Sequence, residues 1–219
     1  MKPNLVPFGD SALLIQFGDE VDPLLNQRVH SLDRLIAADP KAGVVEAVPA
    51  YATLLIHYDP LRLSYVQLRD WVDPLIDRIE SNATRPPRRL EVPVRYGGEG
   101  AMDLEFVAAA HQLSPHEVAR LHAGREYTVY MMGFTPGFAY MGKLDDRIAT
   151  GRLETPRTRV AAGSVGIAGL QTGIYPIDSP GGWRIIGLTR LHLFDLNADP
   201  PILFSPGDSV RFVIEAVDV

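Results

Sequence analysis

The sequence has 219 residues, of which 46% are hydrophobic and 22% charged, and it contains no cysteine. This length and composition are typical of a globular chain with one large domain or two small ones. The missing thiol excludes disulfides, a cysteine nucleophile, thiolate zinc sites and iron–sulfur clusters. No apolar stretch approaches the roughly 18 residues that span a bilayer, and the first residues show no apolar signal region. We therefore expect a cytoplasmic protein with no membrane partner.

The formal net charge of −6 argues against nucleic acid as a partner, because phosphate neutralisation supplies most of that affinity. The charge is unevenly distributed along the chain. Residues 120–190 contain nine Lys or Arg and five Asp or Glu, so this segment is +4 and the remainder −10. The difference fits either ordinary variation in surface charge or a local site for an anionic small molecule.

The first third of the chain alternates between strand and helix patterns. The first helix has an acidic cap at Asp22 followed by a proline, and Pro74 predicts a bend or a break in the second helix. Strands are predicted at residues 12–17, 44–48, 53–58 and 90–94, and helices at residues 22–39 and from Ser64 onward. This β-α-β-β-α-β order predicts a ferredoxin-like α/β domain over residues 1–85, with its returning strand near 90–95.

The second half of the chain begins after a polar, proline-bearing segment at residues 82–89, which we interpret as a linker. Two short helices follow, the second with a capping box formed by Ser114 and Glu117. Beyond residue 126 short β runs alternate with glycine and proline turns, at residues 129–132, 165–168, 184–188, 192–194 and 209–217. This pattern predicts a closed or nearly closed β-barrel, so we expect an α+β chain with a barrel domain at residues 90–219.

Residues 133–142 are unusual because they combine three glycines, one proline and three aromatic residues. Glycine lets a backbone approach a ligand closely, and aromatic rings supply the apolar walls of a binding site. A tight turn buried by its own aromatic rings explains the same composition. The candidate substrate-binding residues here are Phe134, Thr135, Pro136, Gly137, Phe138 and Tyr140.

Arg157 and Arg159 are two residues apart, so on an extended strand their side chains lie on one face. Two guanidinium groups on one face can hold a carboxylate or a phosphate, although surface arginines without such a partner are common. The following small-residue segment matches neither a Walker loop nor a dinucleotide fingerprint, and no catalytic serine motif surrounds Ser164. Its candidate substrate-binding residues, with the nearby tryptophan, are Gly163, Ser164, Gln171, Thr172, Gly173, Tyr175 and Trp183.

The histidines give no metal-binding pattern. His111, His116 and His122 are spaced by five and six residues, which does not place them on one helical face. We therefore predict no metal site and assign no catalytic residue. His122 is the histidine of greatest interest because it directly precedes the unusual segment.

Several of these runs together closely resemble the family of 5-oxoprolinase B subunits. The resemblance is carried by residues 133–142, Pro156-Arg157, and residues 162–169, 171–176 and 179–183, with further similarity at residues 9–14 and 57–60. The family includes sporulation-kinase inhibitors and is related to the carboxyltransferase region of urea amidolyases (allophanate hydrolase subunit 1-like). Ala161 departs from the family pattern, where proline is usual, and residues 143–146 replace a more glycine-rich stretch.

The resemblance implies a fold, an activity and partners. The fold is a small α/β domain followed by a cyclophilin-like β-barrel. The activity is cleavage of 5-oxo-L-proline to L-glutamate with ATP hydrolysis, carried out together with the 5-oxoprolinase subunits C and A. It does not show whether this chain itself binds ATP.

Two alternative functions follow from the same family. One is a regulatory protein that inhibits a histidine kinase, and the other is a carboxyltransferase or allophanate hydrolase subunit of a urea pathway. Self-association of the isolated chain is a further option, because a chain that pairs with a related subunit exposes an apolar face.

Overall fold

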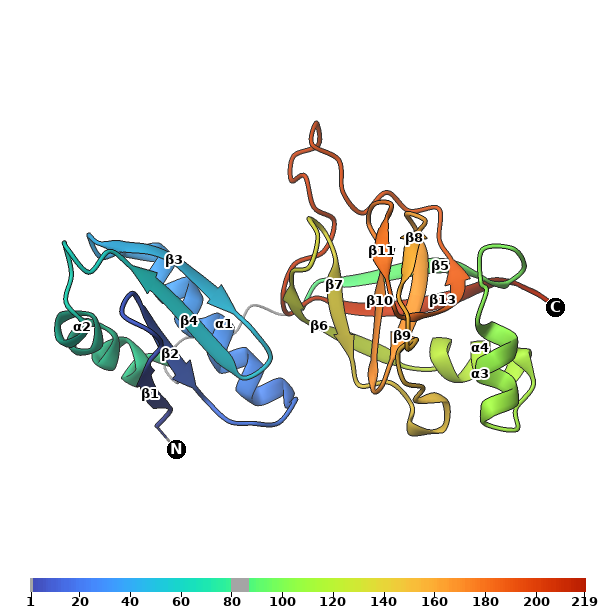
Figure 1. Ribbon diagram of the computed structural model, residues 1–219, viewed down its shortest axis with the longest axis horizontal. Coiled ribbons are helices and arrows are strands. Elements are labelled where there is room, and N and C mark those ends of the chain that lie inside the picture. Colours follow the sequence, from blue (N-terminus) through green and yellow to red (C-terminus); the bar gives the residue numbers. More distant parts are fainter. Residues whose placement is uncertain (1, 80–86) are drawn as a thin grey trace. The chain divides into compact units, whose positions relative to one another are not determined.

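The computed structural model of the chain describes residues 2–79 and 87–219 (Figure 1). The chain forms two compact units, Met1–Pro86 and Pro87–Val219, which we call the amino-terminal unit and the barrel unit. Of the linker expected at residues 82–89, the part up to residue 86 lies outside the described residues.

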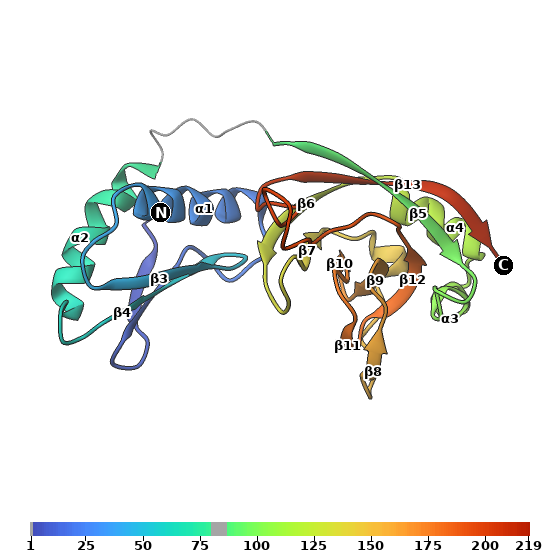
Figure 2. The same ribbon diagram turned by 90° about the horizontal axis from the view of Figure 1, so that it is seen from above.

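The amino-terminal unit is a four-stranded antiparallel sheet with two helices on one side (Figure 2). The strands are ordered β1-β2-β4-β3 across the sheet. Its elements are β1 (Asn4–Pro7), β2 (Ala12–Gln16), α1 (Pro23–Ala38), β3 (Val44–Pro49), β4 (Thr53–Tyr58) and α2 (Tyr65–Asp77). The core between sheet and helices is apolar and includes Leu13, Ile15, Leu32, Leu54, Ile56 and Leu68.

Both helices begin where the sequence predicts. The Asp22 carboxylate accepts hydrogen bonds from the backbone N–H groups of Leu24 (2.8 Å) and Leu25 (2.9 Å), which caps α1. Ser64 and Gln67 form a capping box at the start of α2. The break considered at Pro74 does not occur, because α2 continues to Asp77. Packing of its buried face, which includes Val72 and Ile76, offsets the hydrogen bond that proline removes.

The predicted ferredoxin-like strand order is wrong. The segment at 90–94 does not return to the first sheet but belongs to β5 (Arg89–Gly97) of the barrel unit. The sheet edge beside β2 is instead occupied by β1, a strand not predicted from the sequence. Leu5 pairs with Ile15 and Val6 pairs with Leu14, so this short amino-terminal run fills the edge position. The described order of elements in this unit is therefore ββαββα.

The barrel unit contains the closed β-barrel that the sequence predicts. Seven strands form the ring β10-β7-β6-β13-β5-β12-β9, and β9 pairs with β10 to close it. A two-stranded sheet of β8 and β11 lies outside this ring of strands. The further elements are α3 (Leu104–Ala110), α4 (Pro115–Ala123), β6 (Glu126–Met132), β7 (Ala139–Gly142), β8 (Arg157–Val160), β9 (Ser164–Ala168), β10 (Gln171–Ile174), β11 (Ser179–Gly181), β12 (Arg184–Leu188) and β13 (Ser209–Asp218), with a 3-10 turn at Asp146–Ile148.

The first and last strands of the barrel lie side by side. β5 and β13 pair in parallel over their whole length, from Arg89 opposite Ser209 to Gly97 opposite Asp218 (Figure 2). The strand predicted at 192–194 is wrong, because only an isolated bridge joins Phe194 to Ile202. The barrel core is apolar, and its larger members include Tyr96, Tyr127, Ile174 and Phe212.

Candidate functional site

An aromatic cluster joins the glycine-rich run 133–142 to Tyr175 and Trp183. The Phe138 ring packs edge-to-face against Tyr175 (centroids 5.3 Å apart) and Trp183 (5.4 Å). All three side chains are buried, together with Val160 and Ile185. Most of the aromatic residues predicted as pocket walls therefore pack against one another.

Phe134 is the exception in this cluster. Its side chain is 61% exposed although it contacts Phe138 at a centroid distance of 5.7 Å. Its backbone φ of 68° is in the left-handed region, which non-glycine residues adopt uncommonly. The loop therefore displays one apolar ring above a buried aromatic layer.

Two glycines permit the close packing of this loop. A Cβ at Gly173 would lie 2.8 Å from the Ala139 carbonyl oxygen, which is too close for any side chain. Gly137 has a φ of 85°, and a Cβ there would lie 3.1 Å from the Phe194 Cβ. These glycines let backbones approach each other, which is a structural requirement of the loop.

The arginines of β8 do not share one anion. The Arg157 Nη2 donates to Asp103 Oδ1 at 2.9 Å, and its Nη1 donates to the Trp183 carbonyl at 3.4 Å. Arg159 instead donates to Asp178 Oδ2 at 2.6 and 2.9 Å, in an exposed pair. Each guanidinium therefore already contacts its own carboxylate, and the two do not form the predicted clamp.

Asp103 organises the inner arginine. Its side chain is 5% exposed and accepts from Arg157, from Arg184 Nη1 (3.4 Å) and from the Ile185 backbone N–H (2.7 Å). Asp103 and Arg184 were not predicted as site residues from the sequence. The local sequence carries no signal for this contact, since Asp103 precedes Arg157 by 54 residues.

His122 lies at the centre of a buried hydrogen-bond chain. The Thr172 hydroxyl donates to the Gly166 carbonyl (3.0 Å) and so accepts from His122 Nε2 at 2.8 Å. The other ring nitrogen, Nδ1, then accepts from the Tyr96 hydroxyl at 2.6 Å. These contacts assign the neutral Nε2–H tautomer. Complete burial lowers the pKa of His122 to about 3, which agrees with a neutral ring.

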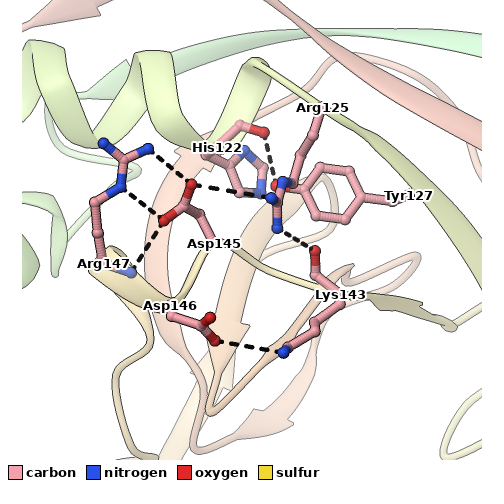
Figure 3. Close-up of polar contacts among 7 residues, drawn as sticks. All are labelled: His122, Arg125, Tyr127, Lys143, Asp145, Asp146 and Arg147. Carbon is pink, nitrogen blue, oxygen red and sulfur yellow. Dashed lines mark hydrogen bonds and ion pairs between the residues drawn. The ribbon is translucent and has the colours of Figure 1, made fainter. Parts of the chain in front are cut away.

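The hydrogen bonds with His122 and Gly166 hold Thr172 inside the barrel core. Its side chain is fully buried in the barrel and both hydrogen-bonding functions of its hydroxyl are used. The Tyr127 hydroxyl donates to the His122 carbonyl at 2.7 Å, which fixes the end of α4 (Figure 3). The histidine singled out by sequence position is thus part of the barrel core.

Charged side chains form ion pairs within the loop that follows β7 (Figure 3). Asp145 accepts from the Arg147 backbone N–H and side chain at 2.9–3.0 Å, and lies 4.0 Å from Arg125. Lys143 pairs with Asp146 at 3.7 Å, and its carbonyl accepts from Arg125. The hydrogen bonds from Arg147 lower the pKa of Asp145 to about 2. Part of the positive charge of segment 120–190 is therefore paired locally.

The predicted site residues differ widely in exposure. The hydroxyl oxygen of Thr135 is buried and has no hydrogen-bond partner in the described part of the chain. Phe134, Pro136 and Arg159 are exposed, Thr135, Tyr140, Arg157 and Gln171 are half-buried, and Gly137, Phe138, Gly163, Ser164, Thr172, Gly173, Tyr175 and Trp183 are buried. The residues that reach the surface beside the aromatic cluster are therefore few.

Two further properties concern the described residues, 2–79 and 87–219. Among them, no group of three or more His, Asp or Glu side chains is placed to hold a metal ion. None of their helices is both long and apolar enough to cross a membrane.

The chain matches the family model for the carboxyltransferase domain, subdomain C and D, over residues 3–204. This match defines the class of protein. At 44% identity the chain is similar to the B subunit of 5-oxoprolinase from Bacillus subtilis, covering 97% of this chain and 93% of that protein. It is 42% identical to the corresponding B subunit from Escherichia coli O157:H7, with 94% and 93% covered. The chain belongs to the family of 5-oxoprolinase B subunits.

Solved structures share this fold. TTHA0988 is 38% identical with a TM-score of 0.82 over 93% of this chain, which spans 39% of that longer chain. The conserved uncharacterized protein PH0987 from Pyrococcus horikoshii is 47% identical with a TM-score of 0.57, covering 97% of this chain and 98% of that one. The Kluyveromyces lactis urea amidolyase, at 19% identity and a TM-score of 0.77, shares the fold alone.

Proposed function

We propose that this chain is the B subunit of an ATP-dependent 5-oxoprolinase, which converts 5-oxo-L-proline to L-glutamate together with subunits A and C. The observation that carries the proposal is 44% identity over 97% of the chain to a protein of that name. We place the complex in the cytoplasm and describe the barrel as cyclophilin-like.

The chemistry explains why ATP is used. A five-membered lactam is a resonance-stabilised amide and a poor electrophile. Transfer of the ATP γ-phosphoryl group to the lactam oxygen makes the ring carbon open to attack by water. The transfer releases ADP, and cleavage of the C–N bond after the attack of water gives γ-glutamyl phosphate. A second water then hydrolyses this acyl phosphate to glutamate and inorganic phosphate. Cationic donors stabilise the charge that develops on the carboxylate and phosphoryl oxygens.

The barrel unit offers donors suited to such anions. Arg157 and Arg184 lie beside the buried aromatic cluster and are positioned by Asp103. We assign no acid, base or nucleophile of the reaction to this chain, because the buried His122 is fully used in the core. Titration of the purified chain with ATP tests whether the nucleotide contacts it.

Reconstitution tests the proposal directly. Purified subunits A and C are assayed for glutamate formation from 5-oxo-L-proline and ATP, with and without this chain. We expect activity only when all three are present. A double variant, Arg157→Ala with Gln171→Ala, is expected to lower the activity, whereas Arg211→Ala, an exposed arginine on β13, serves as the matched control. Full activity from subunits A and C alone would overturn the proposal.

A further inference from the structure

Three arginines gather around Trp183, and only one of them was predicted as a site residue. The segment 151–153 is hydrogen-bonded to the segment 182–184. Leu153 N–H donates to the Gly182 carbonyl at 2.8 Å, and Arg184 Nε donates to the Gly151 carbonyl at 3.4 Å. Arg152 lies between these two attachments, and its guanidinium carbon is 5.9 Å from the centre of the Trp183 ring.

The charges in this region are not balanced. Arg157 and Arg184 both contact Oδ1 of one buried carboxylate, Asp103. Arg152 is exposed, and the described residues provide it with no ion-pair partner. Two guanidinium groups therefore share one carboxylate, and Arg152 adds a third positive charge beside the indole.

The inner arginines are held in place before any ligand arrives. Two hydrogen bonds with Ile185 fix Asp103. The Asp103 backbone N–H donates to the Ile185 carbonyl (2.8 Å), and the Ile185 backbone N–H donates to the Asp103 carboxylate (2.7 Å). The Arg184 guanidinium also lies 3.9 Å from the centre of the Phe106 ring. Such anchoring lowers the entropy lost when an anion binds.

Buried aromatic and hydroxyl groups lie beside these arginines. Burial raises the pKa of the Tyr175 phenol, and a hydrogen bond with the Trp183 backbone and the positive charges of Arg152 and Arg157 oppose that rise. Ser179 is 8% exposed, lies on the strand paired with β8, and its hydroxyl has no partner in the described residues. Cationic groups and an unpartnered hydroxyl therefore lie together at the edge of the buried aromatic cluster.

We propose that Arg152, Arg157 and Arg184 form a binding site for the oxyanion of a small molecule, a carboxylate or a phosphoryl group. Asp103 orients the two inner arginines and Arg152 supplies uncompensated charge. Arg159, bound to Asp178 outside this group, takes no part. The choice of 5-oxo-L-proline and ATP as candidate ligands rests on the proposed function, whereas the site itself rests on the geometry.

Intrinsic fluorescence of the full chain reports on this site. The chain has two tryptophans, so Trp71→Phe leaves Trp183 as the sole indole. The chain is titrated with 5-oxo-L-proline, inorganic phosphate and ATP, and with 2-pyrrolidinone, the same lactam without a carboxylate. Excitation at the red edge avoids absorption by ATP. We expect saturable quenching with at least one anion and none with 2-pyrrolidinone. Response to 5-oxo-L-proline alone identifies a carboxylate site, and response to phosphate or ATP identifies a phosphoryl site.

Substitutions locate the binding. Arg152→Ala is expected to raise the Kd for the anion at least about tenfold, because the substitution removes the positive charge that has no ion-pair partner. The positions of Arg157 and Arg184 do not depend on Arg152, since Asp103 holds them. Arg152→Lys is expected to restore most of the affinity, and Arg211→Ala to leave it unchanged. Thermal unfolding of each variant verifies that it folds.

Three results would overturn the site: no saturable anion binding, equal binding of 2-pyrrolidinone, or an unchanged Kd in folded Arg152→Ala. The reconstituted complex separates this outcome from failure of the proposed function. If the site is wrong but the function is right, glutamate formation still requires this chain, with an unchanged KM in Arg152→Ala. If the function is wrong, activity is independent of the chain.

Discussion

Asp103 and Asp178 each bind one arginine of the short strand β8, yet their surroundings are opposite. The Asp103 carboxylate is 5% exposed and holds Arg157, Arg184 and a backbone N–H. The Asp178 carboxylate is 46% exposed and holds Arg159 and the Ala162 backbone N–H. A buried carboxylate must keep its partners, whereas water replaces those of an exposed one. Two similar ion pairs, whose arginines are two residues apart, therefore differ in how much they contribute to the free energy of unfolding.

The largest expected effect is that of Asp103→Ala. This change leaves two guanidinium groups and the Ile185 N–H without their acceptor, and we expect a loss of about 3–5 kcal/mol in the free energy of unfolding. Urea unfolding followed by circular dichroism measures it. Asp178→Ala is the matched control. Equal losses in the two variants would contradict the distinction between the two aspartates.

The buried hydrogen bond between His122 and Thr172 extends this comparison to an uncharged pair. Thr172→Val keeps the shape of the side chain but leaves His122 Nε2–H without an acceptor. We expect a loss of about 1–3 kcal/mol, measured by the same unfolding experiment. Thr172→Ser retains the hydroxyl and is expected to recover much of this loss. Wild-type stability in Thr172→Val would show that the hydrogen bond is not needed.

The buried His122 also makes the stability of the protein depend on pH. His122 has a pKa of about 3 in the folded protein and an ordinary value of 6.5. The unfolded chain therefore binds a proton that the folded chain does not, and stability falls as the pH is lowered from about 6.5 toward 3. Between these two pKa values the slope from this residue is about 1.4 kcal/mol per pH unit. His122→Gln removes it, so the stability difference between wild type and variant should narrow on acidification.

The smallest effect is expected for Arg159→Ala. Both side chains of the Arg159–Asp178 pair are largely exposed, so water and salt compensate for its loss. We expect no measurable change in the urea midpoint at any ionic strength. A clear destabilisation that disappears in high salt would show that this surface pair does contribute.

Local patterns in the sequence predict the helix starts and the closed barrel. Asp22, Ser64 and Ser114 cap helices as expected, because an N-cap interaction involves only neighbouring residues. The sequence pattern predicts the strand at 90–94 but places it in the wrong sheet. Its alternating burial suits either sheet, and the choice depends on β13, which lies about 120 residues further along the chain.

The sequence predicts which residue types the candidate site contains, but not which of them contact one another. Spacing places Arg157 and Arg159 on one strand, but it contains no information about Asp103, which arrives from the start of α3. The aromatic residues of the run 133–142 do form a cluster with Trp183. The burial of Phe138 follows from its packing against Tyr175 and Trp183. Long-range contacts of this kind leave no periodic signal in a single sequence.

The position of β13 in the ring affects how the protein is made. β13 lies between β5 and β6 in the barrel, and its Phe212 packs on the His122 ring at 4.4 Å. Among the seven strands of the barrel β13 comes last in the sequence, so the nascent barrel keeps two unpaired edges until residues 209–218 emerge from the ribosome. The amino-terminal sheet, by contrast, has all four strands by residue 58. Translation that stalls shortly before residue 209 therefore produces a chain with one complete sheet and an open, aggregation-prone barrel.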